Sequence, residues 1–189
     1  MKVRVYHDGI HEAHGALEAL LKKLCPRIAT CDCIPSKNVG GKLLHGKGSR
    51  LLKKAILCTQ QAHSEGFDAV VLLVDEDGDK SRLRDLEAAC HQEIPNTLPR
   101  RAYAVAIHSF DAWILADEKA MSFALGRPVH RTPEPEKISN PKAKAREICG
   151  TDMALRDFYA RVAEQADLET LKRRCPEGFS SFALQIAKW

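Results

Sequence analysis

The 189-residue sequence has no long apolar run, no C-x-x-C pair, and no acidic residue between Asp32 and Glu65. Its longest purely apolar run, Ala69 to Val74, is far shorter than the roughly 20 residues that a membrane-spanning helix needs. Charged residues also interrupt the N-terminus, so we expect no signal peptide. We therefore expect a cytoplasmic protein that is not inserted in a membrane.

The seven cysteines are scattered along the chain. Without a secretion signal, cysteines are more often reduced than paired in disulfides. We expect free thiols that pack as small apolar groups, with Cys31 and Cys33 on the same face of a strand. Metal or redox chemistry at this C-x-C is the alternative.

The acid-free interval carries six cationic side chains, so the charge of the chain is unevenly distributed. They are Lys37, Lys42, Lys47, Arg50, Lys53 and Lys54. Because the whole chain has a net charge of +4, the rest of it is weakly acidic. A concentrated basic segment suits a polyanionic partner, and we expect Lys42, Lys47 and Arg50 to bind phosphate or nucleic acid. A solvated loop and helix face is the alternative.

Residues 41–48 read G-x-x-x-x-G-K-G, one residue away from a P-loop. The Ser or Thr that contacts Mg²⁺ in that motif is replaced by Gly48, and no clear buried strand precedes the segment. We expect a phosphate-contacting loop here rather than a site of nucleotide hydrolysis.

Strand and helix patterns alternate along the first 124 residues. Strands are expected near residues 3–8, 27–34, 68–74 and 103–107, and helices over 11–24, 49–64 and 82–92. This alternation predicts an α/β fold with a mainly parallel central sheet flanked by helices. From residue 125 to residue 189, prolines and helical patterns predict a helical C-terminal extension that packs on the same domain.

The most informative segment is the run Val70 to Val74, which is followed directly by Asp75-Glu76-Asp77-Gly78-Asp79. The run predicts a strand buried on both faces, and clefts in open α/β sheets form at the carboxyl ends of strands. Carboxylates this close raise one another's pKa unless a cation neutralises them. We therefore expect a hard divalent cation, Mg²⁺ or Mn²⁺, and phosphate-ester chemistry.

Three known chemistries begin with such a cluster. A calcium-binding EF-hand loop is excluded, because the sixth residue counted from Asp75 is Lys80 and the twelfth is Leu86. A haloacid-dehalogenase-type phosphatase carries D-x-D-G-T, which fits Asp75 to Gly78. Asp79 replaces the Thr, however, and that motif usually closes the first strand, which makes this the weaker alternative.

The third chemistry is that of the Toprim site, which pairs an acid after the first strand with a D-x-D after a later one. Asp8 and Glu12 follow the first expected strand, and Asp75 and Asp77 follow the third. A parallel sheet would bring these two strand ends to the same edge.

On these motifs, the chain resembles the Toprim-related family known as domain of unknown function 4276 over nearly its full length. His7 to Glu12 resembles V-E-G-x-T-E, and the strand with Asp75 and Asp77 matches the D-x-D of the family. The most specific match is Asp111 to Asp117, which closely resembles E-A-W-L-L-A-D. Asp8 and Asp111 stand where Glu is usual, which keeps the charge but shortens each side chain by one methylene.

The resemblance implies a Toprim-like fold and a Mg²⁺-dependent nuclease acting on DNA or RNA, linked to an ATPase partner or to defence. It implies metal binding by Asp75, Asp77, Asp79 and Asp111, with Asp8 orienting or deprotonating the attacking water and Glu12 completing the acidic shell. The alternative is a non-catalytic module that binds a nucleotide or a partner protein, which the replacement of Glu by Asp8 mildly favours.

Three further features have simpler interpretations. His7, His11 and His14 invite a zinc site, but His11 and His14 are three residues apart where the metalloprotease motif needs four. We expect polar residues at a helix start instead. Trp113 is expected in the core, and Asp117 is expected to cap the following helix.

Overall fold

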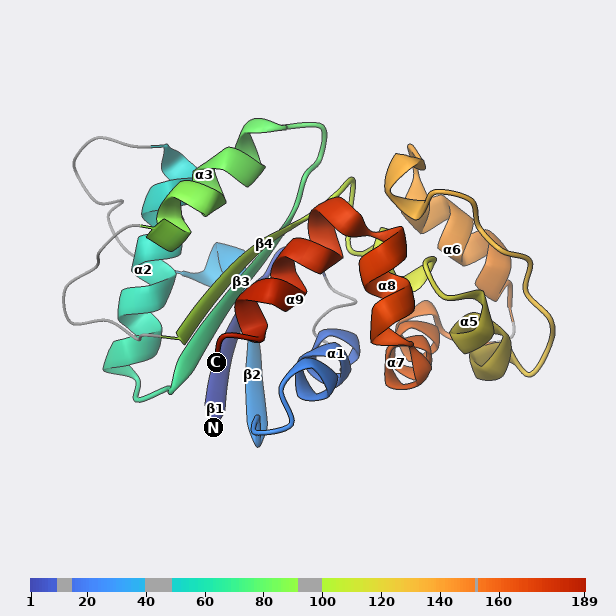
Figure 1. Ribbon diagram of the computed structural model, residues 1–189, viewed down its shortest axis with the longest axis horizontal. Helices are drawn as coiled ribbons and strands as arrows, with labels where there is room; N and C mark the ends of the chain where they lie inside the picture. The colour runs from blue at the N-terminus through green and yellow to red at the C-terminus, as the bar shows by residue number, and fades with distance from the viewer. Residues whose placement is uncertain (10–14, 40–48, 92–99, 152) are drawn as a thin grey trace.

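A computed structural model of the chain has a four-stranded, fully parallel sheet with the spatial order β2-β1-β3-β4 (Figure 1). The strands are β1 Lys2–His7, β2 Thr30–Pro35, β3 Ala69–Asp75 and β4 Arg100–Ala106. The structure describes residues 1–9, 15–39, 49–91, 100–151 and 153–189. The predicted α/β class with a parallel sheet is confirmed.

Helices connect the strands and form most of the C-terminal part. They are α1 Ala16–Leu24, α2 Arg50–Ser64, α3 Ser81–His91, α4 Asp111–Ile114, α5 Glu118–Leu125, α6 Pro141–Cys149, α7 Leu155–Gln165, α8 Leu168–Arg174 and α9 Ser181–Ile186. Short helical turns lie at η2 Ser36–Asn38, η3 Pro135–Lys137 and η4 Pro176–Ser180. The expected segments agree with these bounds to within a few residues wherever the chain is described.

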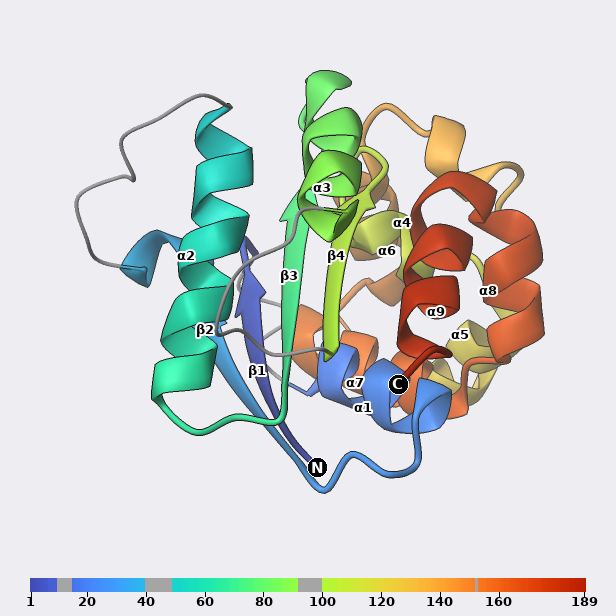
Figure 2. The ribbon, with the colours of Figure 1, turned by 60° about the vertical axis from the view of Figure 1, so that its left-hand side comes forward.

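The sheet is covered on both faces (Figure 2). On one face, Val70 and Leu72 of β3 pack with residues of α2 and α3. On the other face, Val71 and Leu73 pack with α1 and the C-terminal helices. Because alternate residues of a strand point to opposite faces, burial of both faces explains why the whole run is apolar.

The C-terminal helices share the hydrophobic core of the sheet. Phe158 of α7 and Phe182 of α9 lie in the same buried cluster as Val71 and Leu73. Helix α9 also covers the edge strand β4, where the Gln185 side chain pairs with both backbone groups of Tyr103, accepting from its N–H at 2.9 Å and donating to its carbonyl at 2.8 Å. An edge strand with unpaired backbone groups can pair with a strand of another chain. Gln185 prevents this at Tyr103, because it already occupies both backbone groups of that residue.

The seven cysteines all lie among the described residues and are free thiols. Burial raises the pKa of Cys58 to about 12, so this thiol is protonated at neutral pH and packs as a small apolar group. Within the described ranges, no helix is long and apolar enough to cross a membrane.

Candidate functional site

The carboxyl ends of β1, β3 and β4 bring acidic residues to one edge of the sheet. In the register of the sheet, His7 pairs with Leu73 and Asp75 pairs with Ala106. Asp8 therefore follows β1 beside the end of β3, and the segment after β4 leads to Asp111. We call Asp8, Asp75, Asp77 and Asp111 the strand-edge carboxylates. The predicted meeting of the first and third strand ends is confirmed by this register.

Asp75 is the central member of this group. Its Oδ1 accepts a hydrogen bond from the Phe110 backbone N–H at 2.9 Å. Burial raises the pKa of Asp75 to about 7, and the negative charges of Asp77, Asp111 and Asp8 raise it as well, while the Phe110 hydrogen bond acts in the opposite direction. The three other strand-edge carboxylates are thus close enough to Asp75 to disfavour its ionised form.

Asp77 stands on a sharp turn between β3 and α3. Its φ of 50° and the φ of 76° at Gly78 both lie in the left-handed region, which Asp and Gly adopt more readily than most residues. The turn leaves the Asp77 side chain 62% exposed, and its Oδ2 lies 3.0 Å from Nη1 of Arg82. The same guanidinium nitrogen donates to the Asp75 backbone carbonyl. Arg82 was not predicted as a site residue. The sequence feature that could have indicated it is its position at the start of the helix that follows the acidic run.

Asp79 is held by the start of α3. Its Oδ1 accepts from the Ser81 backbone N–H at 3.0 Å and from the Ser81 hydroxyl at 2.6 Å. These hydrogen bonds lower the pKa of Asp79, because they favour the ionised form. The metal-binding role predicted for Asp79 would have to share this carboxylate with the helix start.

Asp8 is oriented by two residues from different segments. The Ser36 hydroxyl donates to Asp8 Oδ1, and Lys54 Nζ in turn donates to Ser36 Oγ at 2.7 Å. The Lys54 ammonium lies 3.9 Å from the same Asp8 oxygen. Ser36 follows β2 and no sequence pattern indicated it, whereas Lys54 belongs to the predicted basic segment.

A cleft of about 730 Å³ opens beside Asp8. Its lining includes Lys37, Arg50 and Lys54 of the basic segment, and Asp79 and Arg82 of the turn into α3. Arg50 was predicted to bind phosphate, and the structure places it in this cleft. The other predicted phosphate-binding residues, Lys42 and Lys47, lie outside the described residues, as do Glu12, His11, His14 and the P-loop-like segment 41–48.

Asp111 is 7% exposed and accepts a hydrogen bond on each carboxylate oxygen. The Tyr159 hydroxyl of α7 donates to Oδ1, and the Ser109 hydroxyl donates to Oδ2 at 2.8 Å. A direct metal bond from Asp111 would compete with these two donors. Asp111 is therefore better placed to act on Asp75 through its charge than by ligation.

The rest of the segment matching E-A-W-L-L-A-D has structural roles. Trp113 is 1% exposed and packs against Phe110, Phe179 and Phe182, which confirms the prediction that it belongs to the core. Asp117 caps α5, as predicted, because its Oδ1 accepts from the backbone N–H groups of Lys119 and Ala120.

Glu76, the remaining acid of the run after β3, is tied to the segment after β4. It is buried, and its Oε2 accepts from the His108 backbone N–H at 3.3 Å and lies 4.0 Å from His108 Nδ1. His108 has a φ of 57°, so a second non-glycine residue beside the strand ends takes the left-handed conformation. The Glu76 contact connects the ends of β3 and β4.

The donor chemistry of the site fits Mg²⁺ or Mn²⁺. Asp8, Asp75 and Asp77 each keep one carboxylate oxygen that makes no hydrogen bond within the described residues, and hard divalent cations prefer such oxygens. In the conformation of the described residues, however, no three Asp, Glu, His or Cys side chains converge closely enough to hold a metal. The carboxylates would have to move towards one another around a cation.

Comparison with known proteins identifies one family. The model of the family described as Domain of unknown function (DUF4276) matches residues 13–187. The matched range includes Asp75, Asp77 and Asp111, and it begins after Asp8 and Glu12. No curated protein and no solved structure matches the chain.

Proposed function

The chain belongs to the family described as Domain of unknown function (DUF4276), and from its strand-edge carboxylates we propose that it is a metal-dependent phosphodiesterase with a Toprim-like site that cleaves DNA or RNA. The observation that carries the proposal is the environment of Asp75. Partial burial raises the pKa of this side chain to about 7, and the negative charges of Asp77, Asp111 and Asp8 add to the increase. Carboxylates this close destabilise one another's ionised form unless a cation neutralises them. A strongly raised carboxyl pKa of this kind is typical of a functional site.

The cleft beside the carboxylates supports a phosphate-bearing substrate. Its lining includes the cationic side chains of Lys37, Arg50 and Lys54 together with Asp8, and the Lys54 ammonium lies 3.9 Å from an Asp8 oxygen. A phosphate group bound by these cations would lie next to Asp8 and close to the end of β3. This juxtaposition of cationic and acidic side chains favours phosphate-ester hydrolysis over the binding of a neutral ligand.

The residues present have separable roles in such a reaction. A divalent cation held by Asp75 and Asp77 would neutralise their charge and withdraw electrons from a phosphate oxygen. Asp8, oriented by Ser36 and Lys54, would accept a proton from the attacking water. Asp111 would remain hydrogen-bonded to Tyr159 and Ser109 and would keep the site negatively charged.

A second function is favoured by one specific observation. Two of the carboxylates already have cationic neighbours within the chain, since Asp77 pairs with Arg82 and Asp8 lies near Lys54. Ion pairs of this kind can replace the cation that a catalytic site would need. The alternative is therefore a non-catalytic module that binds a nucleotide or a partner protein in the same cleft.

The deciding experiment is a cleavage assay with labelled single- and double-stranded DNA and RNA, in Mg²⁺, in Mn²⁺ and in EDTA. Asp75→Asn should reduce metal-dependent cleavage by at least about 100-fold, because it removes the charge of the central ligand. Asp157→Asn is the matched control, since Asp157 is an exposed acid of α7 that does not line the cleft.

Cleavage that is equal in the wild type and in Asp75→Asn would indicate a contaminating nuclease and would overturn the catalytic proposal. If the wild type cleaves none of the substrates, nucleotide titration by calorimetry tests the alternative, in which Lys54→Ala should weaken binding.

A further inference from the structure

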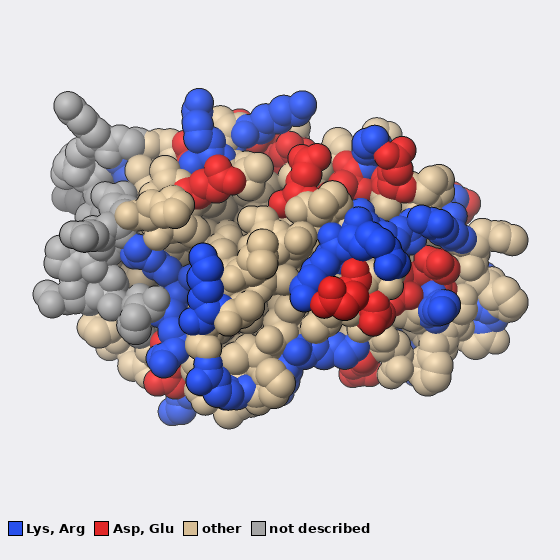
Figure 3. Space-filling model, in the orientation of Figure 1, with Lys and Arg blue, Asp and Glu red and all other residues tan. Residues whose placement is uncertain are grey.

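A second charged hollow lies on the helical side of the molecule, away from the strand edge. It has a volume of about 320 Å³, and seven side chains from α5, α8 and the segments next to them line it. All seven are charged or carry a hydroxyl group, which excludes an apolar ligand. Figure 3 shows Lys and Arg side chains gathered over α8 on this face, whose last turn contains Lys172, Arg173 and Arg174.

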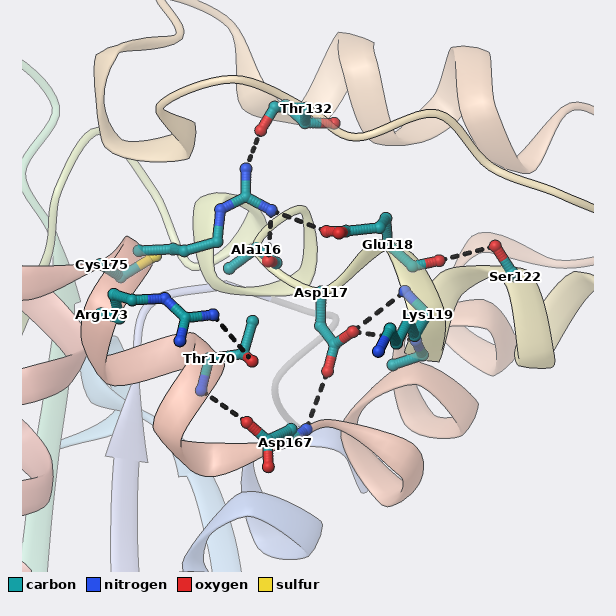
Figure 4. A network of polar contacts seen from close by, with 12 residues as sticks. Ala116, Asp117, Glu118, Lys119, Ser122, Thr132, Asp167, Thr170, Arg173 and Cys175 are labelled. Atoms are coloured by element: carbon teal, nitrogen blue, oxygen red, sulfur yellow. Dashed lines mark hydrogen bonds and ion pairs between the residues drawn. The ribbon is translucent and has the colours of Figure 1, made fainter.

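The two acids of the hollow are already satisfied by groups of the protein (Figure 4). Asp117 Oδ1 accepts from the backbone N–H groups of Lys119 and Ala120, and its Oδ2 accepts from the Asp167 N–H at 2.8 Å. Glu118 Oε2 lies 2.9 Å from Nη1 of Arg174. Neither acid needs a further cation.

The four cations of the hollow differ in how they are engaged. Arg174 has a side chain that is only 6% exposed, and it donates to the carbonyls of Ala116 and Thr132 as well as to Glu118. Lys119 and Arg131, by contrast, are exposed, and neither side chain has a carboxylate partner among the residues that the structure describes. These two cations are available to a ligand.

Arg173 is the third available cation. Its Nη2 donates to the Thr170 hydroxyl oxygen at 3.3 Å, and among the described residues no carboxylate lies within ion-pair distance of it, although its charge helps to lower the pKa of Asp167. A neighbouring hollow of about 280 Å³ is also lined by Arg131, Arg173 and Arg174. Arg131 and Arg173 thus border both hollows. The hollow of about 320 Å³ has a net charge of +2, because four of its lining residues are cationic and two are acidic.

We propose that this hollow is a phosphate-binding site in which Arg131, Arg173 and Lys119 contact the anion and the Thr170 hydroxyl donates to it. Guanidinium groups present several N–H donors in a plane that matches phosphate oxygens, and their positive charge strengthens each hydrogen bond. The phosphate belongs either to a nucleic-acid strand or to a small free phosphate compound. The site does not depend on the chemistry of the strand edge.

Two binding measurements in EDTA test the site. Fluorescence anisotropy with a labelled single-stranded oligonucleotide reports on a strand, and calorimetry with inorganic pyrophosphate reports on a small anion. The double variant Arg131→Ala/Arg173→Ala should weaken binding of at least one probe by about tenfold. If the probe is the strand, the slope of log affinity against log salt should fall by about 1.4, the value for two phosphate contacts on a single strand.

The matched control is Arg156→Ala/Arg161→Ala, which removes the same charge from α7, a helix that lines neither hollow. Thermal melts of both double variants should match the wild type, because Arg131 and Arg173 are exposed. Weaker binding by Arg131→Ala/Arg173→Ala alone supports the site, and the probe whose binding is weakened identifies the source of the phosphate. Equal effects of the two double variants, or no binding of either probe by the wild type, would overturn it.

Loss of binding in the first variant would support this site even if the protein cleaves no nucleic acid. A failure of the proposed nuclease function is therefore distinguishable from a failure of this inference.

Discussion

Charged side chains gather both at the strand edge and where α5 meets α8, around Asp117 and Arg174, which we call the junction. The charges of these two regions are balanced in different ways. At the junction, Asp117 accepts three backbone N–H groups and Arg174 donates to three acceptors. At the strand edge, Asp75 has one such donor, and the nearby side chains that raise its pKa are further carboxylates. The contacts at the junction hold helices together, whereas the Asp75 carboxylate has no ion-pair partner among the described residues, which is the electrostatic condition for binding a cation.

The largest effect is expected from a substitution at Asp8, on the strand edge. Asp8→Asn should reduce metal-dependent cleavage by about 100- to 10,000-fold, the usual contribution of a general base, and should change stability little. Parallel measurement of cleavage rate and of the urea midpoint checks this. Undiminished cleavage by this variant would show that Asp8, which lies outside the matched range of the family, is not the base.

At the junction, Arg174→Ala should lower the free energy of unfolding by about 3 kcal/mol, because it leaves a carboxylate and two carbonyl oxygens without their buried donor. Its neighbour Arg173→Ala removes the same group from an exposed position and should cost less than about 0.5 kcal/mol. Urea denaturation of both variants tests the difference. Similar losses for the two would mean that the Arg174 contacts do not hold the helices together.

Asp75→Asn should increase stability at high pH, in contrast to its effect on cleavage. The pKa of Asp75 is raised from 3.8 to about 7, so the unfolded chain loses this proton at lower pH than the native protein does. The unfolding free energy of the wild type should therefore fall as pH rises from about 4 to about 7. A shift of this size corresponds to at most about 4 kcal/mol, and partial exposure to water reduces the expected gain at pH 8 to about 2 kcal/mol.

Chemical denaturation of the wild type and Asp75→Asn across this pH range measures the effect. The two curves should coincide below about pH 4 and separate above it, and Mg²⁺ should stabilise only the wild type at pH 8. Parallel curves at all pH values would show that Asp75 is ionised in the native protein without any penalty.

The smallest effect is expected at Tyr159. Tyr159→Phe removes the hydroxyl that donates to Asp111 and should cost about 1.5 kcal/mol, since hydrogen bonds to charged groups contribute more than those between neutral groups. Tyr103→Phe is the matched comparison, because the Tyr103 hydroxyl bonds to the neutral Thr59 hydroxyl. A larger loss for Tyr103→Phe would argue that the Tyr159 contact contributes little.

Much of the fold and the centre of the candidate site could be predicted from local patterns. The apolar run of β3 indicated a strand buried on both faces, and the acids directly after it indicated the functional edge, because neighbouring residues share an element. The partners of those acids could not be predicted. Ser36, Arg82 and Tyr159 come from three other elements, and their side chains meet the carboxylates only after the chain has folded.

The sequence by itself determined the parallel α/β architecture and the position of Asp75 and Asp77 at a strand end. The patterns that predict helices and buried strands involve residues that are close together in the sequence. Only the tertiary structure decided which charges are balanced. Asp117 and Asp75 are similar as acids in the sequence, but packing gives Asp117 backbone donors from α5 and from Asp167 before α8, and leaves Asp75 partly buried in the field of other carboxylates. Electrostatic balance depends on distances between segments far apart in the chain, and local patterns do not contain those distances.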